Sequence, residues 1–223
     1  MSDFLSHEDP NKIICQGIGE GHTGKEEKNI NMNRKWFKIF MRMTKVDYGK
    51  NLVLKGIPVI FNKSGAKLTI GEGVTIKSSF FSNLVGLYNR TIIVTRSPEA
   101  EIVIGDHVGI SGGTIYARKK IVIGSHTCIG GNTKILDNDF HPIEADKRNK
   151  LLSDENGGDS NLIPAKEIII GKNCFIGCNV IILKGTVLGD GCVVGAGAVV
   201  SGKFESNCVI AGNPAQVIRR LKV

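Results

Sequence analysis

Aliphatic residues recur every six positions in the C-terminal part of the chain. The unbroken series is Ile170, Ile176, Ile182, Leu188, Val194 and Val200. Four positions after each of them stands a second, mostly small residue: Cys174, Val180, Thr186, Cys192, Ala198 and Phe204. An α-helix repeats every 3.6 residues and a half-buried strand every two. A period of six is instead typical of an all-β parallel β-helix, in which each hexad supplies a short strand and a turn.

The same phase occurs earlier in the chain, at Ile70, Ile76, Ile104, Ile110, Ile123, Ile129 and Ile135. We therefore expect the repeats to form one unit over residues 50–206. Three hexads make one triangular coil, so residues 18 apart should stack at about 4.8 Å, the spacing of paired strands. The predicted stacked pairs are Ile170 with Leu188, Ile176 with Val194, and Ile182 with Val200. A β-sandwich, the alternative all-β fold, would need no fixed period.

The N-terminal segment, residues 1–49, lacks this period. Residues 1–30 are polar and are expected to form a loop or arm. From residue 32 onward, Met32, Trp36, Phe40 and Met43 recur at helical spacing opposite basic side chains, which predicts an amphipathic helix. This helix could cover the open end of the first coil or dock on an anionic membrane surface. We favour the cap.

Composition narrows the class of protein. A chain of 223 residues can bury one sizeable core, and its net charge of +8 suits an anionic small molecule or surface. Nucleic acid is not expected as a partner, because no basic stretch is interleaved with aromatic residues that could stack on bases. No apolar run reaches the roughly 18 residues of a spanning helix, and the N-terminus lacks the order of a secretory signal, so we expect a cytoplasmic protein.

The cysteines and two histidines fall into the repeat. Cys174 and Cys192 occupy the inward small position one coil apart, where a reduced thiol acts as a small buried apolar group. Cys174 and Cys178 are close in sequence but have no second Cys or His pair at zinc-like spacing, so no metal site is expected. His107 and His126 stand in similar turns and are expected to be structural neighbours on an outer corner.

One segment, residues 137–167, interrupts the repeats. It begins with the sequence DNDFHP and is rich in charged residues, glycine and proline, so we expect it to project as an exposed loop. A histidine at the root of such a loop can act as a general base, and a nearby carboxylate can stabilise its imidazolium. His141 and Asp139 are therefore candidate catalytic residues.

Residues 168–202, IIIGKNCFIGCNVIILKGTVLGDGCVVGAGAVVSG, and the tail AGNPAQVIRRL at 211–221 closely resemble a known family. This family is the hexapeptide-repeat acyltransferases, in particular the maltose, galactoside, nodulation-factor and exopolysaccharide O-acetyltransferases. The resemblance covers about residues 50–222. It implies a left-handed β-helix, a homotrimer with active sites in clefts between neighbours, and acetyl-coenzyme A as acyl donor. His141-Pro142 stands where the family's His-Pro pair supplies the catalytic base.

The resemblance also implies roles for residues of the repeats and the tail. The backbone N–H of Cys178 matches the position that stabilises the oxyanion, and residues 207–223 match the cofactor-binding tail. Residues at positions that contact the coenzyme are Phe175 and Gly177 near the acetyl group, Ala196 and Ser201 along the pantetheine arm, Pro214 at the adenine, and Arg219 and Arg220 at the phosphates. Ser111 and Asp137 are the expected acceptor contacts.

The expected activity is transfer of an acetyl group from acetyl-coenzyme A to a hydroxyl of a sugar or polysaccharide precursor. No Ser or Cys has a motif context that would make it a nucleophile beside His141, so direct transfer is expected. Acetylation of an amino sugar or of serine is an open alternative. A β-helical metalloenzyme would need converging histidines, two of them close in sequence, and a non-catalytic scaffold would lack the loop histidine.

Overall fold

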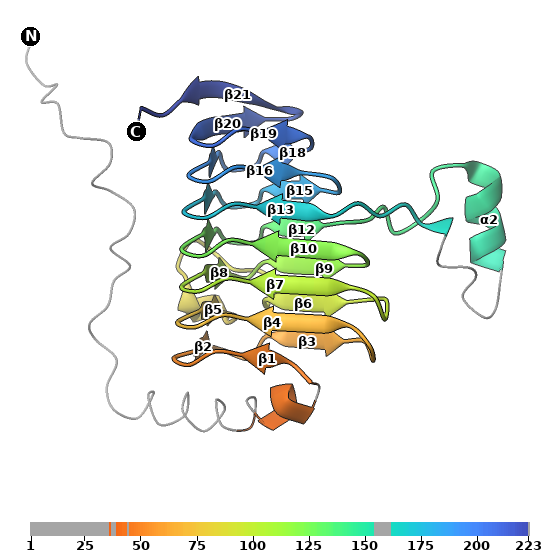
Figure 1. Cartoon of the computed structure of the whole chain (residues 1–223), viewed down its shortest axis with the longest axis horizontal. Helices are drawn as coiled ribbons and strands as arrows, with labels where there is room; N and C mark the ends of the chain where they lie inside the picture. Colours follow the sequence, from red (N-terminus) through yellow and green to blue (C-terminus); the bar gives the residue numbers. More distant parts are fainter. Residues whose placement is uncertain (1–35, 37–38, 44, 154–161, 223) are drawn as a thin grey trace, which may run out of the picture.

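A computed structural model describes residues 36, 39–43, 45–153 and 162–222. The chain winds into a left-handed parallel β-helix (Figure 1), and its three sheets form the three sides of a triangular prism. Sheet A contains β1 (Asp47–Tyr48), β4 (Lys67–Ile70), β7 (Glu101–Ile104), β10 (Lys120–Ile123), β13 (Ile168–Ile170), β16 (Val187–Leu188) and β19 (Lys203–Phe204). Sheet B contains β2 (Val53–Lys55), β5 (Thr75–Lys77), β8 (Gly109–Ser111), β11 (Cys128–Ile129), β14 (Phe175–Ile176), β17 (Val193–Val194), β20 (Cys208–Gly212) and β21 (Ala215–Arg220). Sheet C contains β3 (Val59–Asn62), β6 (Ile92–Thr95), β9 (Thr114–Ala117), β12 (Lys134–Leu136), β15 (Ile181–Leu183) and β18 (Val199–Val200).

Each coil visits the three sheets in turn and so has three corners. We call them corner AB, corner BC and corner CA after the sheets they join. Neighbouring coils pair in parallel, and the antiparallel hairpin of β20 and β21 closes the C-terminal end of sheet B. The expected tail 207–223 thus begins with the last strands of the coil.

The six-residue phase is confirmed. Ile170 pairs with Leu188, Ile176 with Val194 and Ile182 with Val200, and the side chains of all six are at most 1% exposed. The second position is buried as well, except for half-buried Phe204. Each aliphatic side chain therefore packs between those of the coils above and below, and burial contributes about 1.5 to 3 kcal/mol per side chain.

Close stacking of the corners explains the glycine after the aliphatic residue. A Cβ at Gly171 would lie 2.6 Å from the backbone nitrogen of Asp190 in the next coil. Corner AB also carries a column of residues with positive φ, among them His107 (56°) and His126 (61°). Their rings stack with centroids 4.9 Å apart, which confirms that they are neighbours on an outer corner.

Residues 39–43 are helical and lie beneath the first coil (Figure 1). The prediction of which residues form the buried side of this helix is wrong. Met41 is fully buried, whereas Trp36 is 71% and Met43 78% exposed, and Met32 lies outside the described residues. The Val46 N–H donates to the Met41 carbonyl at 3.0 Å, so the chain turns directly into β1, and this turn directs Met41 toward the core.

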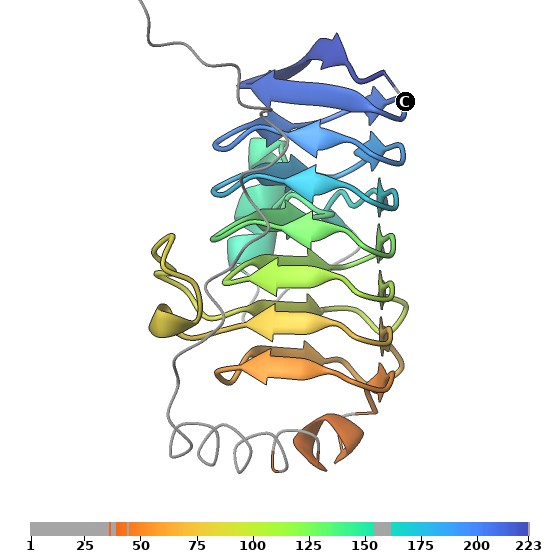
Figure 2. The ribbon, with the colours of Figure 1, turned by 90° about the vertical axis from the view of Figure 1, so that its left-hand side faces the viewer.

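Two segments leave the coil. The expected loop 137–167 departs at corner CA and contains a helix, α2 (Ala145–Ser153), which the sequence analysis missed (Figure 1). A second segment, loop 78–91, leaves at corner BC between β5 and β6 and contains the short 3-10 helix η1 (Phe80–Ser82), as seen in Figure 2. This loop was not predicted, although the aliphatic phase is interrupted between Ile76 and Ile104.

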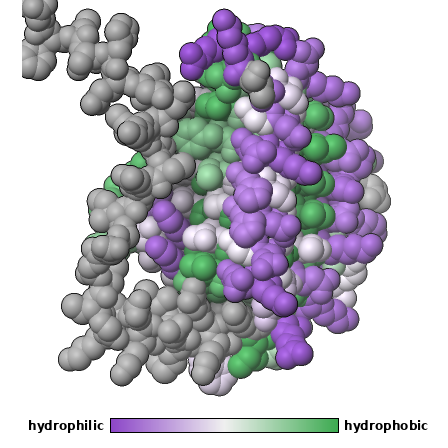
Figure 3. Space-filling model, turned by 60° about the vertical axis from the view of Figure 1, so that its left-hand side comes forward, coloured by the Kyte–Doolittle hydropathy of each residue, from purple (hydrophilic) through white to green (hydrophobic). Residues whose placement is uncertain are grey.

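Figure 3 shows one side of the molecule, part of which is covered by the residues drawn in grey. Hydrophilic side chains form columns along the length of the molecule, with hydrophobic side chains between them. These columns follow from the stacking of equivalent positions in successive coils.

Candidate active site at two corners of the coil

Asp137 fixes the root of the protruding loop. Its side chain is fully buried, and its carboxylate accepts hydrogen bonds from the backbone N–H groups of Arg118 (2.8 Å), Lys119 (2.7 Å) and Lys120 (2.9 Å) and from the Asn138 amide (3.0 Å). Burial raises the pKa of the Asp137 carboxyl, and these four donors oppose that rise. The carboxylate therefore holds the loop to the preceding coil, and its oxygens are not available to an acceptor as the sequence analysis expected.

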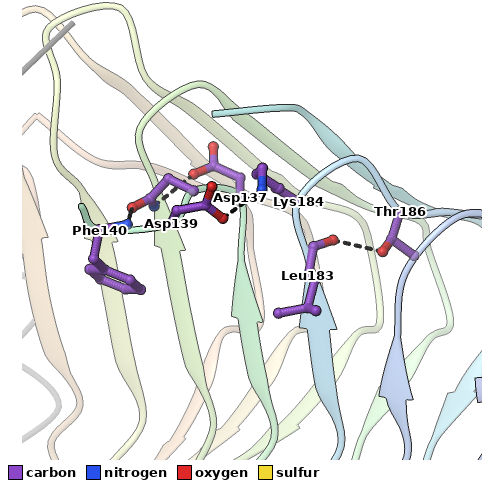
Figure 4. Close-up of polar contacts among 7 residues, drawn as sticks. Asp137, Asp139, Phe140, Leu183, Lys184 and Thr186 are labelled. Carbon is purple, nitrogen blue, oxygen red and sulfur yellow. Dashed lines mark hydrogen bonds and ion pairs between the residues drawn. The ribbon is translucent and has the colours of Figure 1, made fainter. Parts of the chain in front are cut away.

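Asp139 lies on the next turn of the loop root. Its Oδ1 accepts a hydrogen bond from the Nζ of Lys184 at 2.6 Å, in an ion pair that is about three-quarters buried, as Figure 4 shows. Its Oδ2 is buried and has no hydrogen-bond partner among the described residues. The expected contact between this carboxylate and the imidazole of His141 is not made, but the His141 backbone N–H donates to the Asp139 carbonyl at 2.7 Å. Asp139 thus positions the backbone of His141 rather than its ring.

His141 itself is exposed and lines a cavity of about 460 Å³. The preceding residue, Phe140, has a φ of 63°, and its N–H donates to the Asn138 side chain at 2.9 Å, so a tight turn presents the histidine. The ring of Phe140 packs against Tyr116 with centroids 4.9 Å apart. The other lining residues come from corner CA and from the loop: Lys63, Arg96, Ser97, Pro98, Arg118, Leu151, Leu152 and Ile163.

A second group of expected site residues lies at corner BC. Phe175 is 37% exposed, Gly177 is buried beneath the corner, and Cys178 and Ala196 follow one above the other, with the Gly197 N–H donating to the Cys178 carbonyl at 2.9 Å. The backbone N–H of Cys178 makes no hydrogen bond within the described part of the chain. It is therefore able to donate to an oxyanion.

Other residues of corner BC extend this column in both directions. Pro214 lies in the exposed turn between β20 and β21, at the upper end of corner BC. Ser111 lies at the lower end, where it is 8% exposed and its Oγ accepts from Asn83 of loop 78–91 at 3.2 Å. Tyr88 of the same loop donates to the Asn179 side chain at 3.0 Å, so loop 78–91 lies against the corner beside Cys178.

Three of the expected coenzyme contacts lie elsewhere. Ser201 is at corner CA, one position beyond Val200, and therefore stacks near Lys184 rather than Ala196. Arg219 and Arg220 are at the far end of β21, about 15 Å along the strand from its turn, and Arg220 is paired with Glu205 at corner AB. Pro214 and the two arginines therefore lie at opposite ends of β21 within one chain.

The candidate residues thus divide between two corners. Asp137, Asp139, His141 and Ser201 lie at corner CA, whereas Phe175, Cys178, Ala196 and Pro214 lie at corner BC, with sheet C between them. One chain does not bring the candidate base and the candidate oxyanion donor together.

Sequence reasoning missed several residues at corner CA: Lys63, Arg96, Arg118, Tyr116 and Lys184. The four cations share a signal in the sequence, because each directly follows a strand of sheet C.

One known protein family and several solved structures resemble this chain. A family model described as the hexapeptide repeat of succinyl-transferase matches residues 167–201. The chain is a left-handed parallel β-helix built from hexapeptide repeats. A variant of AntD, an N-acyltransferase from Bacillus cereus, in complex with dTDP-4-amino-4,6-dideoxyglucose and coenzyme A, is 19% identical over 83% of this chain and 89% of that chain, with a TM-score of 0.61. A galactoside acetyltransferase in complex with coenzyme A is 21% identical over 87% of this chain and 84% of that chain, with a TM-score of 0.51.

These likenesses confirm the expected fold. A search of curated proteins finds no match to the chain. Within the described ranges, no three His, Cys, Asp or Glu side chains are grouped so that they could hold a metal ion. The helices of the described residues include none that is long and apolar enough to cross a membrane.

Proposed function

We propose that the protein is an acyltransferase that moves an acetyl group from acetyl-coenzyme A to a hydroxyl of a sugar or polysaccharide precursor. The observation that carries the proposal is His141, which a tight turn presents to a cavity of about 460 Å³ at the root of the protruding loop. The same fold is found in AntD and in a galactoside acetyltransferase, both in complex with coenzyme A.

In the proposed reaction, a ring nitrogen of His141 takes the proton from the acceptor hydroxyl as that oxygen attacks the thioester carbonyl carbon. The backbone N–H of Cys178 binds the oxyanion that forms. The carbon–sulfur bond then breaks, the acetyl group remains on the acceptor as an ester, and the thiolate takes the proton back from His141. No covalent intermediate on the protein is needed.

A homotrimer would complete this site. The outer face of sheet C carries at least one apolar side chain in every coil, and its apolar members include Val59, Phe61, Ile92, Val94, Tyr116, Leu136, Ile181, Leu183 and Val199. The outer face of sheet A, in contrast, carries pairs such as Lys120 with Glu101 at 2.8 Å. If three copies packed with their sheet C faces toward one another, this face would be buried. Corner CA of one copy would then lie next to corner BC of the neighbouring copy. His141 and the Cys178 N–H would then meet across the interface.

The upper part of corner BC fits the pantetheine arm of the coenzyme. Ala196 is exposed and small, and a Cβ at Gly197 would meet nothing within 4 Å, so a ligand can approach the backbone closely. Phe175 and Gly177 would flank the acetyl group, and Pro214 the adenine. Ser201 would contribute from the neighbouring copy, whereas Arg219 and Arg220 would reach the phosphates only from the far end of β21.

The amino sugar nucleotide bound to AntD favours one alternative acceptor, an amino sugar, and serine is a second alternative. A panel of hydroxyl and amino acceptors, with product identified by mass spectrometry, would separate O-acetylation from N-acetylation. We propose that the protein is located in the cytoplasm. Peripheral membrane contact would use the exposed Trp36 and Met43 beneath the first coil.

Replacement of the candidate base tests the proposal. His141→Asn should lower acetyl transfer by about 10² to 10⁴ without loss of the fold, because the residue lies outside the stacked core. His126→Asn is the matched control, since asparagine tolerates the positive φ of that corner. Coenzyme A release would be followed with a thiol reagent. Near-normal turnover of a well-folded His141→Asn trimer would exclude His141 as the base.

A further inference from the structure

Loop 78–91 packs closely on corner BC. The side chain of Leu87 is 3% exposed and lies against two glycines of the corner. A Cβ at Gly112 would lie 3.0 Å from the Leu87 Cδ2, and a Cβ at Gly131 would lie 3.2 Å from the same atom. A larger residue at either position would therefore compete with Leu87 for space. Because the corner carries glycine where the loop packs, the loop has a fixed place on the coil.

Two hydrogen bonds join the loop to the coil that contains β12. The Asn132 Nδ2 donates to the Gly86 carbonyl at 2.9 Å, and the Tyr88 N–H donates to the Asn132 Oδ1 at 3.2 Å. Asn132 stands just before β12, at the end of this strand that meets corner BC. The protruding loop 137–167 begins directly after β12, at corner CA. Tyr88 and the root of the protruding loop therefore lie at opposite ends of the same strand.

The proposed homotrimer would bring these two ends together. Both loops project from the middle part of the coil (Figure 2). Rotation about a threefold axis parallel to the coil does not change the height of a residue along the coil, so each coil would face the same coil of a neighbouring copy. With corner BC of one copy next to corner CA of another, the two ends of β12 would meet. Tyr88 would then face the cavity that His141 of the neighbouring copy lines.

We propose that loop 78–91 forms the wall of the acceptor site opposite His141 of the neighbouring copy, and that Tyr88 selects a cyclic sugar there by stacking on its ring. This inference rests on the proposed acetyl transfer and names a specificity-determining residue for it. The Tyr88 side chain is 68% exposed, and its hydroxyl donates to the Asn179 Oδ1 at 3.0 Å. An aromatic ring held in this way offers an apolar face to the C–H groups of a pyranose. The hydroxyl oxygen can still accept a hydrogen bond from the sugar.

Asn179 connects Tyr88 to the proposed reaction. It directly follows Cys178, whose backbone N–H is the candidate oxyanion donor. The hydrogen bond between Tyr88 and Asn179 therefore places the aromatic ring beside the expected thioester carbonyl. A sugar held between this ring and the cavity at His141 would have a hydroxyl at the boundary between two copies. The candidate base and the candidate oxyanion donor would meet at this boundary.

Photo-crosslinking tests the placement of the loop without any substrate. In the full-length protein, Tyr88 would be replaced by p-benzoylphenylalanine, and the protein would be irradiated. We expect covalent dimers on denaturing gels, with the new bond in loop 137–167 of the second chain. The same replacement at Ile169, which is exposed on sheet A, is the control and should give no dimer. Crosslinks confined to one chain, or dimers joined at another segment, would overturn the proposal.

Steady-state kinetics separate a role in acceptor binding from a purely structural role. Tyr88→Ala should raise the acceptor KM about tenfold and leave kcat and the KM for acetyl-coenzyme A nearly unchanged, because only a contact to the acceptor is lost. Tyr88→Phe keeps the ring and should remain close to the wild type. Methyl glucoside and methyl galactoside are included in the acceptor panel. Equal impairment of the two variants, or a joint rise of both KM values, would indicate a structural role and overturn the proposal.

The two experiments distinguish a failure of this inference from a failure of the proposed function. If dimers form through loop 137–167 but no acceptor of the panel is acetylated, the proposed acetyl transfer fails, and with it the role of Tyr88, while the contact between the loops stands. If acceptors are acetylated but Tyr88→Ala keeps the acceptor KM of the wild type, Tyr88 is excluded from the acceptor site while the acetyl transfer stands.

Discussion

Replacement of Asp137 by asparagine tests how the protruding loop is held. The carboxylate receives two donors on each oxygen: the Arg118 N–H and the Asn138 amide on Oδ1, and the Lys119 and Lys120 N–H groups on Oδ2. An asparagine keeps the shape of the side chain but turns one acceptor into an NH₂ group. Whichever way the amide is oriented, two donors then face another donor.

The size of the effect follows from this count. A buried donor without an acceptor costs about 1 to 3 kcal/mol, so two of them should lower the free energy of unfolding by about 2 to 6 kcal/mol. For a chain of this length, each kcal/mol shifts Tm by about 2 to 4 °C. A loss of about 4 kcal/mol would therefore lower Tm by about 8 to 16 °C.

Thermal unfolding followed by circular dichroism and kinetics on the same protein would measure the two consequences. Asp146→Asn, in the exposed first turn of α2, is the matched control and should change Tm by at most about 1 to 2 °C. If Asp137 instead contacted the acceptor, its replacement would raise the acceptor KM and leave Tm unchanged. An unchanged Tm in Asp137→Asn would refute the reasoning from the four hydrogen bonds.

Three further outcomes are expected. Ile182→Asp should prevent folding, because an unpaired charge between stacked aliphatic side chains costs several kcal/mol against a total stability of about 5 to 15 kcal/mol; a cooperative unfolding transition in this variant would contradict the stacked core. Burial raises the pKa of the Cys174 thiol to about 11, so at pH 8 a thiol reagent should label the exposed Cys128 rapidly and Cys174 only on unfolding, as peptide mass mapping would show. Leu183→Glu on sheet C should dissociate the trimer by light scattering, whereas Ile169→Glu on sheet A, which has a similar exposure (38% against 36%), should not; dissociation in both or in neither would remove sheet C as the interface.

The sequence predicted the coil in detail but only part of the candidate site. The pairing of Ile176 with Val194 could be read from the chain, since a period of six admits one register in which every aliphatic side chain faces inward. The buried side of the N-terminal helix could not, because it depends on the packing of Met41, which was not among the residues predicted on that side. Helix α2 was not predicted, because none of its nine residues has a buried side chain. Its sequence therefore lacks the apolar stripe by which an amphipathic helix is recognised.

The amino-acid sequence by itself determined the repeat, its register and the presence of a histidine at a break in the repeat, because a periodic core imposes the same requirement on every hexad. The tertiary structure alone decided which side chains share a corner. Asp137 is buried among backbone hydrogen-bond donors, and the carboxylate of Asp139 pairs with Lys184 instead of His141. Lys63, Arg96 and Arg118 lie at one corner, although Lys63 and Arg118 are 55 residues apart along the chain. Such contacts depend on where each coil turns, and insertions such as loop 78–91 change the sequence separation between stacked positions, so the spacing in the sequence no longer gives the spacing in space.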